Sequence, residues 1–214
     1  MFDQIKYDIK TIRERDPAAR NNAEVFFLYP GFKAIFWHRI AHKLYNKKHF
    51  FLARWISQSV RNRTGIEIHP AAKIGKGLFI DHGGAVVIGE TAEIGDDCTI
   101  YQGVTLGGTG LHKGKRHPTL GNGVLVGAGA KILGPFKVGD NAKVAAGAVV
   151  LEPIPDNSTA VGVPARVVKK NGVRVNSEMD QIHIPDPVSQ EICKLQKRLE
   201  DLEKQMEDKK GENL

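Results

Sequence analysis

Between residues 65 and 168 the sequence repeats every six residues, and no other feature restricts the fold as strongly. An aliphatic residue opens each unit, glycine often follows it, and the fifth position is small or apolar. A sandwich strand alternates with period two and a helix with period 3.6, so neither produces this pattern. The opening aliphatic residues are Ile68, Ile74, Ile80 and Val86, then, after a slip of two positions, Ile88, Ile94, Ile100 and Leu106, and after a longer break Leu120, Val126, Ile132, Val138, Val144 and Val150.

This repeat predicts a triangular prism in which each coil contributes three short strands. The opening aliphatic residue points inward on each face, the fifth residue must be compact, and glycine permits the backbone angles of the corners. Successive coils lie about 4.8 Å apart, so each strand pairs with the strands above and below it. Stacking supplies the core that a single unit lacks. We therefore predict a parallel β-helix over residues 65–170.

The flanking segments have helical spacing. Residues 1–64 carry apolar residues three and four apart, which predicts an N-terminal α-helical domain with a helix start at Asp16-Pro17 and a break between Asn46 and His49. Residues 171–186 are expected to be a linker and 211–214 a tail. Residues 187–210 have a short coiled-coil seam, which indicates either a trimeric helical stalk or a helix packed on its own domain.

Composition narrows the function. The net charge is +7, but the basic residues are scattered, which fits a plain basic surface or a small polyanionic ligand such as coenzyme A. We expect no nucleic-acid partner, because no basic stripe is interleaved with aromatic residues. We expect no membrane partner, because no run approaches the ~18 apolar residues of a membrane span. The N-terminus does not resemble a signal peptide, and the chain has only two cysteines, which favours the cytoplasm.

The repeat is interrupted twice, and functional residues of a repeat protein are expected at such places. Asp81-His82 marks the first interruption, and the loop from Gly107 to Thr119, which contains Arg116-His117, is the second. Histidine suits proton transfer near neutral pH, and arginine offers a planar fork for a carboxylate. Together with carboxylates, these residues can grip an amino acid and deprotonate its side chain. Cys98 falls at an inward position and is not expected to be a nucleophile.

Several short segments, taken in their order along the chain, resemble those of a known family. They are "RERDPAAR", "GIEIHPAAKIGKGLFIDH", "VTLGGTG", "KRHP", "VGAGAKILG", "AAGAVVLEPIP" and "VGVPARVV", within about residues 10–170. In this order they resemble the serine acetyltransferases of cysteine biosynthesis. The resemblance implies a left-handed β-helix that transfers acetyl from acetyl-CoA to the hydroxyl of L-serine, directly and without a metal.

The same resemblance implies roles for individual residues. His82 is the expected general base, and Glu67 stands where the acid that orients it is found, although many relatives have aspartate there. The remaining positions are Asp16 and Asp81 for the serine ammonium group, Arg116 and His117 for its carboxylate, and Gly108, Thr109, Ala128 and Ala146 for acetyl-CoA.

Partners are also implied by the resemblance. They are L-serine, acetyl-CoA, L-cysteine as a feedback inhibitor, and further copies of the chain in a trimer or a hexamer. Long relatives have a larger helical domain that joins two trimers, and a terminal isoleucine that enters cysteine synthase (O-acetylserine sulfhydrylase). Here about 64 residues precede the prism and the chain ends at Leu214, so the hexamer and the cysteine synthase partnership both stay open.

Three alternatives compete with this interpretation. An acetyltransferase for a sugar or a xenobiotic would keep the histidine but would not need Asp16 and Arg116 to hold a zwitterion. A metal enzyme of the carbonic-anhydrase type would use three histidines, for which His69, His82 and His117 are candidates. A trimeric scaffold would use the C-terminal helix to bind a partner.

Overall fold

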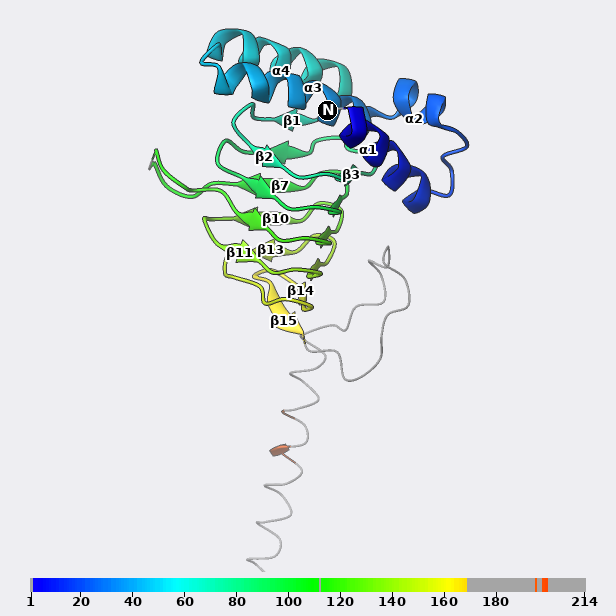
Figure 1. Ribbon diagram of the computed structural model, residues 1–214. Coiled ribbons are helices and arrows are strands. Elements are labelled where there is room, and N and C mark those ends of the chain that lie inside the picture. The colour runs from blue at the N-terminus through cyan, green and yellow to red at the C-terminus, as the bar shows by residue number, and fades with distance from the viewer. Residues whose placement is uncertain (1, 112, 169–194, 196–197, 200–214) are drawn as a thin grey trace, which may run out of the picture.

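The computed structural model describes residues 2–111, 113–168, 195, 198 and 199. Four helices form a layer at one end of the molecule, and a tapering stack of strands extends away from them (Figure 1). The predicted linker 171–186, tail 211–214 and nearly all of the predicted helix 187–210 lie outside the described residues. The helices are α1 (Phe2–Arg15), α2 (Asn22–Leu28), α3 (Pro30–Asn46) and α4 (Phe50–Thr64).

Local signals explain where these helices begin and end. The Asn21 side chain accepts a hydrogen bond from the Glu24 N–H at 2.9 Å and caps α2. Pro30 occupies the first turn of α3, and Gly65 ends α4 in the left-handed region with φ 71°. The break between Asn46 and His49 is confirmed. The helix start expected at Asp16-Pro17 is wrong, because α1 ends at Arg15 and the next helix begins only after the Asn21 cap.

The strands confirm the predicted prism. Three sheets of mainly parallel strands form its faces, and from β1 to β13 successive strands of the chain belong to successive faces. Only the last pair, β14 with β15, is antiparallel. The first sheet contains β1 (Glu67–Ile68), β4 (Val87–Ile88), β7 (Thr105–Gly107), β10 (Lys131–Leu133) and β13 (Val149–Val150); the second β2 (Lys73–Ile74), β5 (Glu93–Ile94), β8 (Thr119–Leu120) and β11 (Lys137–Val138); the third β3 (Phe79–Ile80), β6 (Thr99–Ile100), β9 (Leu125–Val126), β12 (Lys143–Val144), β14 (Thr159–Val161) and β15 (Arg166–Val168).

The pairing of strands shows how many residues each interruption inserts. A regular coil advances 18 residues, as from Val87 to its partner Thr105. The first coil advances 20, from Glu67 to Val87, so two residues are inserted. A coil containing the Gly107–Thr119 loop advances 26, as from Thr99 to Leu125, so this loop inserts eight residues. The coil geometry is kept, and both insertions are confined to corners.

The interior is filled as the repeat predicts. The inward aliphatic residues and the small fifth-position residues form one continuous buried cluster. Cys98 is fully buried, and its thiol donates a hydrogen bond to the Gly121 carbonyl at 3.1 Å. Burial raises the pKa of this thiol to about 12, so Cys98 is a packing residue.

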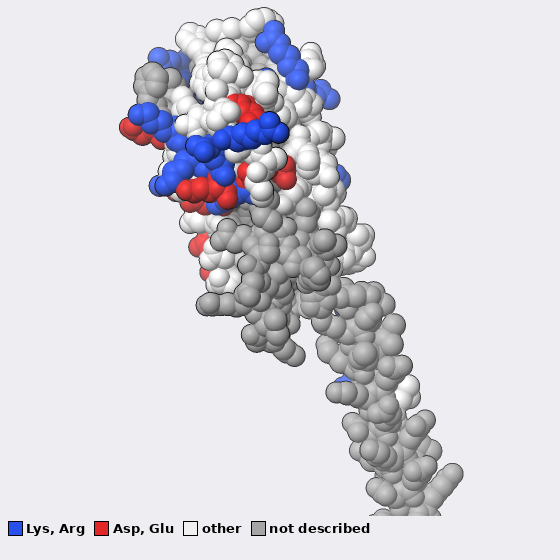
Figure 2. All heavy atoms as spheres, turned by 90° about the vertical axis from the view of Figure 1, so that its right-hand side faces the viewer, with Lys and Arg blue, Asp and Glu red and all other residues white. Residues whose placement is uncertain are grey.

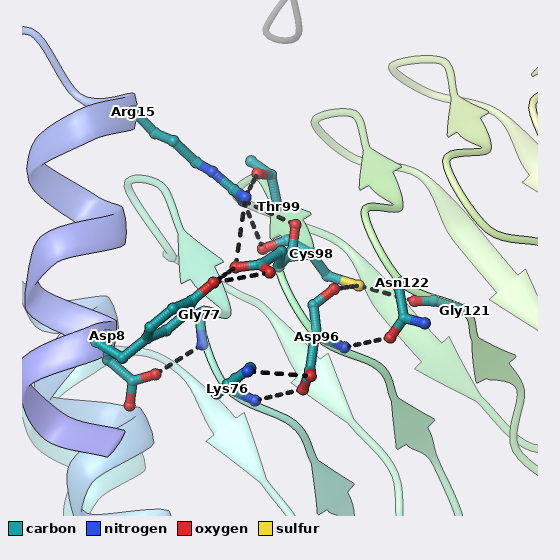
Figure 3. Close-up of polar contacts among 11 residues, drawn as sticks. Asp8, Arg15, Lys76, Gly77, Asp96, Cys98, Thr99, Gly121 and Asn122 are labelled. Atoms are coloured by element: carbon teal, nitrogen blue, oxygen red, sulfur yellow. Dashed lines mark hydrogen bonds and ion pairs between the residues drawn. The ribbon is translucent and has the colours of Figure 1, made fainter. Parts of the chain in front are cut away.

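The helix layer is joined to the prism by polar contacts of α1 (Figure 3). Asp8 is buried, and its carboxylate accepts hydrogen bonds from Arg39 Nη2 at 2.8 Å and from the Gly77 N–H at 2.7 Å. Arg15 donates to the Asp97 carbonyl at 2.8 Å and to Thr99 Oγ1 at 3.0 Å. The end of α1, and with it the following residue Asp16, is therefore fixed against β6.

Acidic and basic side chains are interleaved on the α1 side of the molecule. Figure 2 shows this face. On α1 itself, Lys10 and Glu14 form an ion pair at 3.6 Å. The basic excess of the sequence does not form a continuous stripe here. No helix within the described ranges is long and apolar enough to span a membrane.

Candidate active site

The first interruption forms a tight, strained corner between β3 and β4. His82 has φ 57° and Ala85 has φ 59°, in the left-handed region that few non-glycine residues adopt. The Gly83 N–H donates to the Asp81 carbonyl at 2.6 Å, which closes the turn. The His82 side chain remains 74% exposed, and its Nε2 lies 3.9 Å from Asp81 Oδ1. This corner thus presents an imidazole beside a carboxylate to the outside of the prism.

A second carboxylate, that of Asp16, is held toward the same corner through Tyr29. The Tyr29 hydroxyl donates to Asp16 Oδ2 at 2.6 Å. Burial, the hydrogen bond to Asp16, and the charges of Asp16 and Asp81 all raise the pKa of this phenol. Gly31 makes the approach possible, because a Cβ on it would lie 2.3 Å from the Ile80 carbonyl. Asp81 therefore lies beside His82, and Asp16 is bound to a tyrosine whose pKa the Asp81 charge also raises.

The backbone of Glu67 lies next to this corner, but its carboxylate pairs with arginines of α4. Its N–H donates to the Val86 carbonyl at 2.9 Å, so β1 stacks on the end of the turn. Its carboxylate contacts Arg54 Nη2 at 3.4 Å and Arg61 Nε at 3.2 Å, both on α4. Among the described contacts, none joins Glu67 to His82.

The second interruption forms a densely bonded corner between β7 and β8. Arg116 Nη2 donates to Glu90 Oε2 at 2.5 Å, and this contact holds the pKa of the Glu90 carboxyl below its usual range. His117 is buried, with Nδ1 2.9 Å from Thr91 Oγ1. Burial, and next the Arg116 charge, lower the pKa of His117. Glu90 and Arg116 also line a cavity of about 480 Å³.

Gly108 and Thr109 belong to this second corner. The Thr109 N–H donates to the Arg116 carbonyl at 3.3 Å. A Cβ on Gly108 would lie 2.9 Å from Cγ of Arg116, so a residue without a side chain lets the two strands of the loop approach.

Ala128 and Ala146 lie instead along the edge that begins at His82. Backbone hydrogen bonds link this edge from coil to coil: Gly103 donates to Gly84, Gly129 to Gln102 and Gly147 to Ala128, each at 2.8 Å. Ala128 is half-buried and Ala146 is exposed. A single chain therefore presents two separate edges, one with His82, Ala128 and Ala146 and the other with the Arg116-His117 loop.

The metal alternative gains no ligand set within the described residues, where no group of three or more His, Cys, Asp or Glu side chains is arranged to hold an ion. His69 lies on the Arg116 side, since the charges of Arg116 and Glu90 both act on it. His82 lies at the other corner.

Three contributors were missed from the sequence: Tyr29, Glu90 and Thr91. Their partners lie 13 to 26 residues away along the chain, so no local spacing connects them. The only available signal was position, because Glu90 and Thr91 occupy the corner of the coil directly above the loop.

Several known proteins are similar to this chain along most of its length. Residues 117–152 match the family model "Bacterial transferase hexapeptide (six repeats)". A serine acetyltransferase of Staphylococcus aureus (strain Mu50) is 55% identical over 200 residues, which is 94% of each chain. A serine acetyltransferase of Bacillus subtilis (strain 168) is 52% identical over 209 residues, covering 98% of this chain and 96% of the relative.

Solved structures of such enzymes also match. The Neisseria gonorrhoeae enzyme in complex with serine has a TM-score of 0.76 and 43% identity, covering 78% of this chain and 69% of its own. A serine acetyltransferase complex with CoA has a TM-score of 0.74 and 46% identity, covering 78% and 68%. A complex with cysteine has a TM-score of 0.81 and 44% identity, covering 85% and 71%.

The predicted fold class, a parallel β-helix from the repeat whose left hand was implied by the resemblance, together with N-terminal helices, is confirmed by these matches and the strand topology. Both curated relatives are more than half identical over nearly the whole chain, and both are serine acetyltransferases. The chain belongs to the serine acetyltransferase family of acyltransferases.

Proposed function

We propose that His82 is the general base with which this serine acetyltransferase activates the hydroxyl group of L-serine for attack on acetyl-CoA. The reaction gives O-acetyl-L-serine and CoA, the first step of cysteine biosynthesis from serine. The observation that carries the assignment of the base is the exposed imidazole, fixed in a strained turn beside Asp81. An exposed histidine can take the hydroxyl proton and return it to solvent or to the thiolate.

The acidic groups around His82 support binding of the serine ammonium group. Asp16 accepts a hydrogen bond from the Tyr29 hydroxyl, and the charge of Asp81 also acts on Tyr29, so the two carboxylates are proposed to hold the cation together. The Arg116 guanidinium and the His117 imidazole are proposed to bind the serine carboxylate. Holding a zwitterion in this way favours an amino acid over a sugar.

These groups lie on two edges of one chain, so we propose that the site is completed between subunits. The His82 edge of one copy would face the Arg116 edge of the next, which a trimer satisfies. A hexamer needs a second contact, for which exposed aromatic residues of α4 are suited: Phe51 is 87% exposed and Trp55 61%. Acetyl-CoA would lie between the edges, along Ala128 and Ala146 of one chain and Gly108 and Thr109 of its neighbour.

Glu67 is proposed to orient His82 when substrates bind. This requires its carboxylate to leave Arg54 and Arg61, whose side chains are 46% and 53% exposed. Exposed ion pairs contribute about 0–1 kcal/mol, so the exchange costs little. The domain division proposed is a helical domain to residue 64 and a catalytic prism over 65–170, followed by linker, helix and tail.

L-cysteine is proposed as a feedback inhibitor that occupies the serine site, as the cysteine complex of a 44% identical enzyme suggests. Cytoplasmic localisation is proposed because Cys98 is a free, buried thiol. Cysteine synthase is proposed as a partner that binds Leu214, a residue outside the described part of the chain.

The decisive experiment measures CoA release from acetyl-CoA with L-serine, with a panel of sugar and amine acceptors, and with L-serine plus L-cysteine. We expect release with serine alone and inhibition by cysteine competitive with serine. Sedimentation of the same protein should give a trimer or a hexamer. Turnover of a sugar without turnover of serine would overturn the proposal, and an active monomer would overturn the shared site.

A further inference from the structure

We propose that Thr91 is a positioning residue for the serine-carboxylate side of the active site, a role that rests on the proposed function of Arg116 and His117. Thr91 lies at the corner between β4 and β5, in the coil that precedes the Arg116 loop. No charge of its own and no place in the six-residue repeat distinguishes it. Its contacts do.

The Thr91 hydroxyl uses all of its hydrogen-bonding capacity on two residues. Its oxygen accepts from the Arg116 N–H at 3.0 Å and from the His117 N–H at 3.1 Å. These two bonds occupy both lone pairs of the oxygen. Its proton is then available for His117 Nδ1, which lies 2.9 Å away. A single hydroxyl group therefore fixes the backbone at both proposed carboxylate-binding residues.

The backbone of Thr91 completes the arrangement. Its N–H donates to His117 Nδ1 at 3.2 Å, and its carbonyl accepts from Lys115 Nζ at 2.7 Å. A backbone N–H can only donate, so Nδ1 of His117 must be the acceptor and the ring proton must reside on Nε2. Thr91 thus selects one tautomer of His117, the one whose Nε2–H can donate to an anion.

Gly89 holds the other side of the same imidazole. A Cβ on Gly89 would lie 2.0 Å from Cδ2 and 2.1 Å from Nε2 of His117. Any side chain there would displace the ring. The imidazole is therefore clamped between Gly89 and Thr91, two positions of one turn, and its direction is set by that turn rather than by the loop that carries it.

The test compares Thr91→Val, which keeps the shape and removes the hydroxyl, with Thr91→Ser, which restores it. Because hydrogen bonds within charged sites contribute about tenfold to a hundredfold in affinity, we expect Thr91→Val to raise KM for L-serine by about tenfold or more. KM for acetyl-CoA should stay within about twofold, and Thr91→Ser should return most of the serine affinity. Thr159→Val, at a buried threonine in β14, is the matched control for the loss of a hydroxyl group.

A second variant approaches the ring from its opposite side. Gly89→Ala should raise KM for serine in the same direction, and when it is combined with Thr91→Val the two effects should be less than additive, since both act through His117. Unchanged KM for serine in Thr91→Val, with an active wild type, would overturn the positioning role alone. An inactive wild type would instead overturn the proposed function. Equal loss in Thr91→Val and Thr91→Ser would also contradict the role of the hydroxyl.

Discussion

At the Asp81-His82 corner two inserted residues leave the His82 side chain 74% exposed, whereas at the Arg116-His117 corner eight inserted residues leave His117 only 8% exposed. The short insertion can only turn sharply, and it holds its imidazole through backbone strain. The long insertion has enough chain to fold back, and Thr91 satisfies its backbone groups. The first corner suits a group that must exchange a proton, and the second suits groups that must keep a fixed direction.

The largest expected effect comes from removing the imidazole at the Asp81-His82 corner. His82→Asn should lower kcat/KM for serine about 10²–10⁴-fold, because the general base is lost. Asparagine is chosen because Asn141 and Asn157 adopt φ 55° and 54° in this chain, so the turn is expected to keep its conformation. Steady-state CoA release measures the loss, and the melting temperature should be nearly unchanged.

Two further variants give this result its controls. His49→Asn changes an exposed histidine in the turn before α4 and should leave activity unchanged. Glu67→Gln should lower kcat in wild type but cause no further loss in His82→Asn, because an orienting acid acts only through the base. Full activity in His82→Asn would contradict the assignment of the base.

The next largest effect is expected at the Arg116-His117 corner. Arg116→Lys keeps the charge but loses the planar fork, so KM for serine should rise by about tenfold to a hundredfold, the value of a charged hydrogen bond. The change in kcat should be smaller, since the carboxylate does not react. Arg63→Lys, in the last turn of α4, is the matched control. An equal fall in kcat with unchanged KM would show that Arg116 acts on the reacting atoms instead.

The smallest expected effect comes from a histidine outside both corners. It tests whether burial alone keeps an imidazole from being protonated. His38 in α3 is buried, and burial lowers its pKa to about 3. Between the ordinary histidine pKa and about pH 3, His38 is protonated in the unfolded chain but stays neutral in the folded protein. The free energy of unfolding should therefore fall as the pH decreases below about 6.5, by up to about 1.4 kcal/mol per pH unit from this group.

Urea unfolding at pH 7 and pH 5 measures this slope. His38→Phe should flatten it, and the part that remains should reflect His69 and His117, whose pKa values burial also lowers. An unchanged slope in His38→Phe would show that the buried ring is not the source of acid sensitivity.

Much of the architecture was determined by sequence alone. The six-residue period specifies inward aliphatic side chains and compact corners, and these local rules are satisfied in every coil, so strands as short as Glu67–Ile68 were predictable. The two interruptions were equally visible, because any insertion must leave a regular coil at a corner. His82 and the Arg116-His117 pair were found for this reason.

Only the tertiary structure decided which partners these residues have. Residues that stack on one another in neighbouring coils are 18, 20 or 26 positions apart in the sequence. This separation depends on the insertion that the coil contains. Thr91 therefore meets His117 across a coil, Tyr29 reaches Asp16 from the junction of α2 and α3, and Glu67 pairs with α4 rather than with His82. A repeat sequence encodes its own period, but the residues that meet across coils depend on how many residues are inserted in the coil between them, and contacts with the helix layer follow no repeat at all.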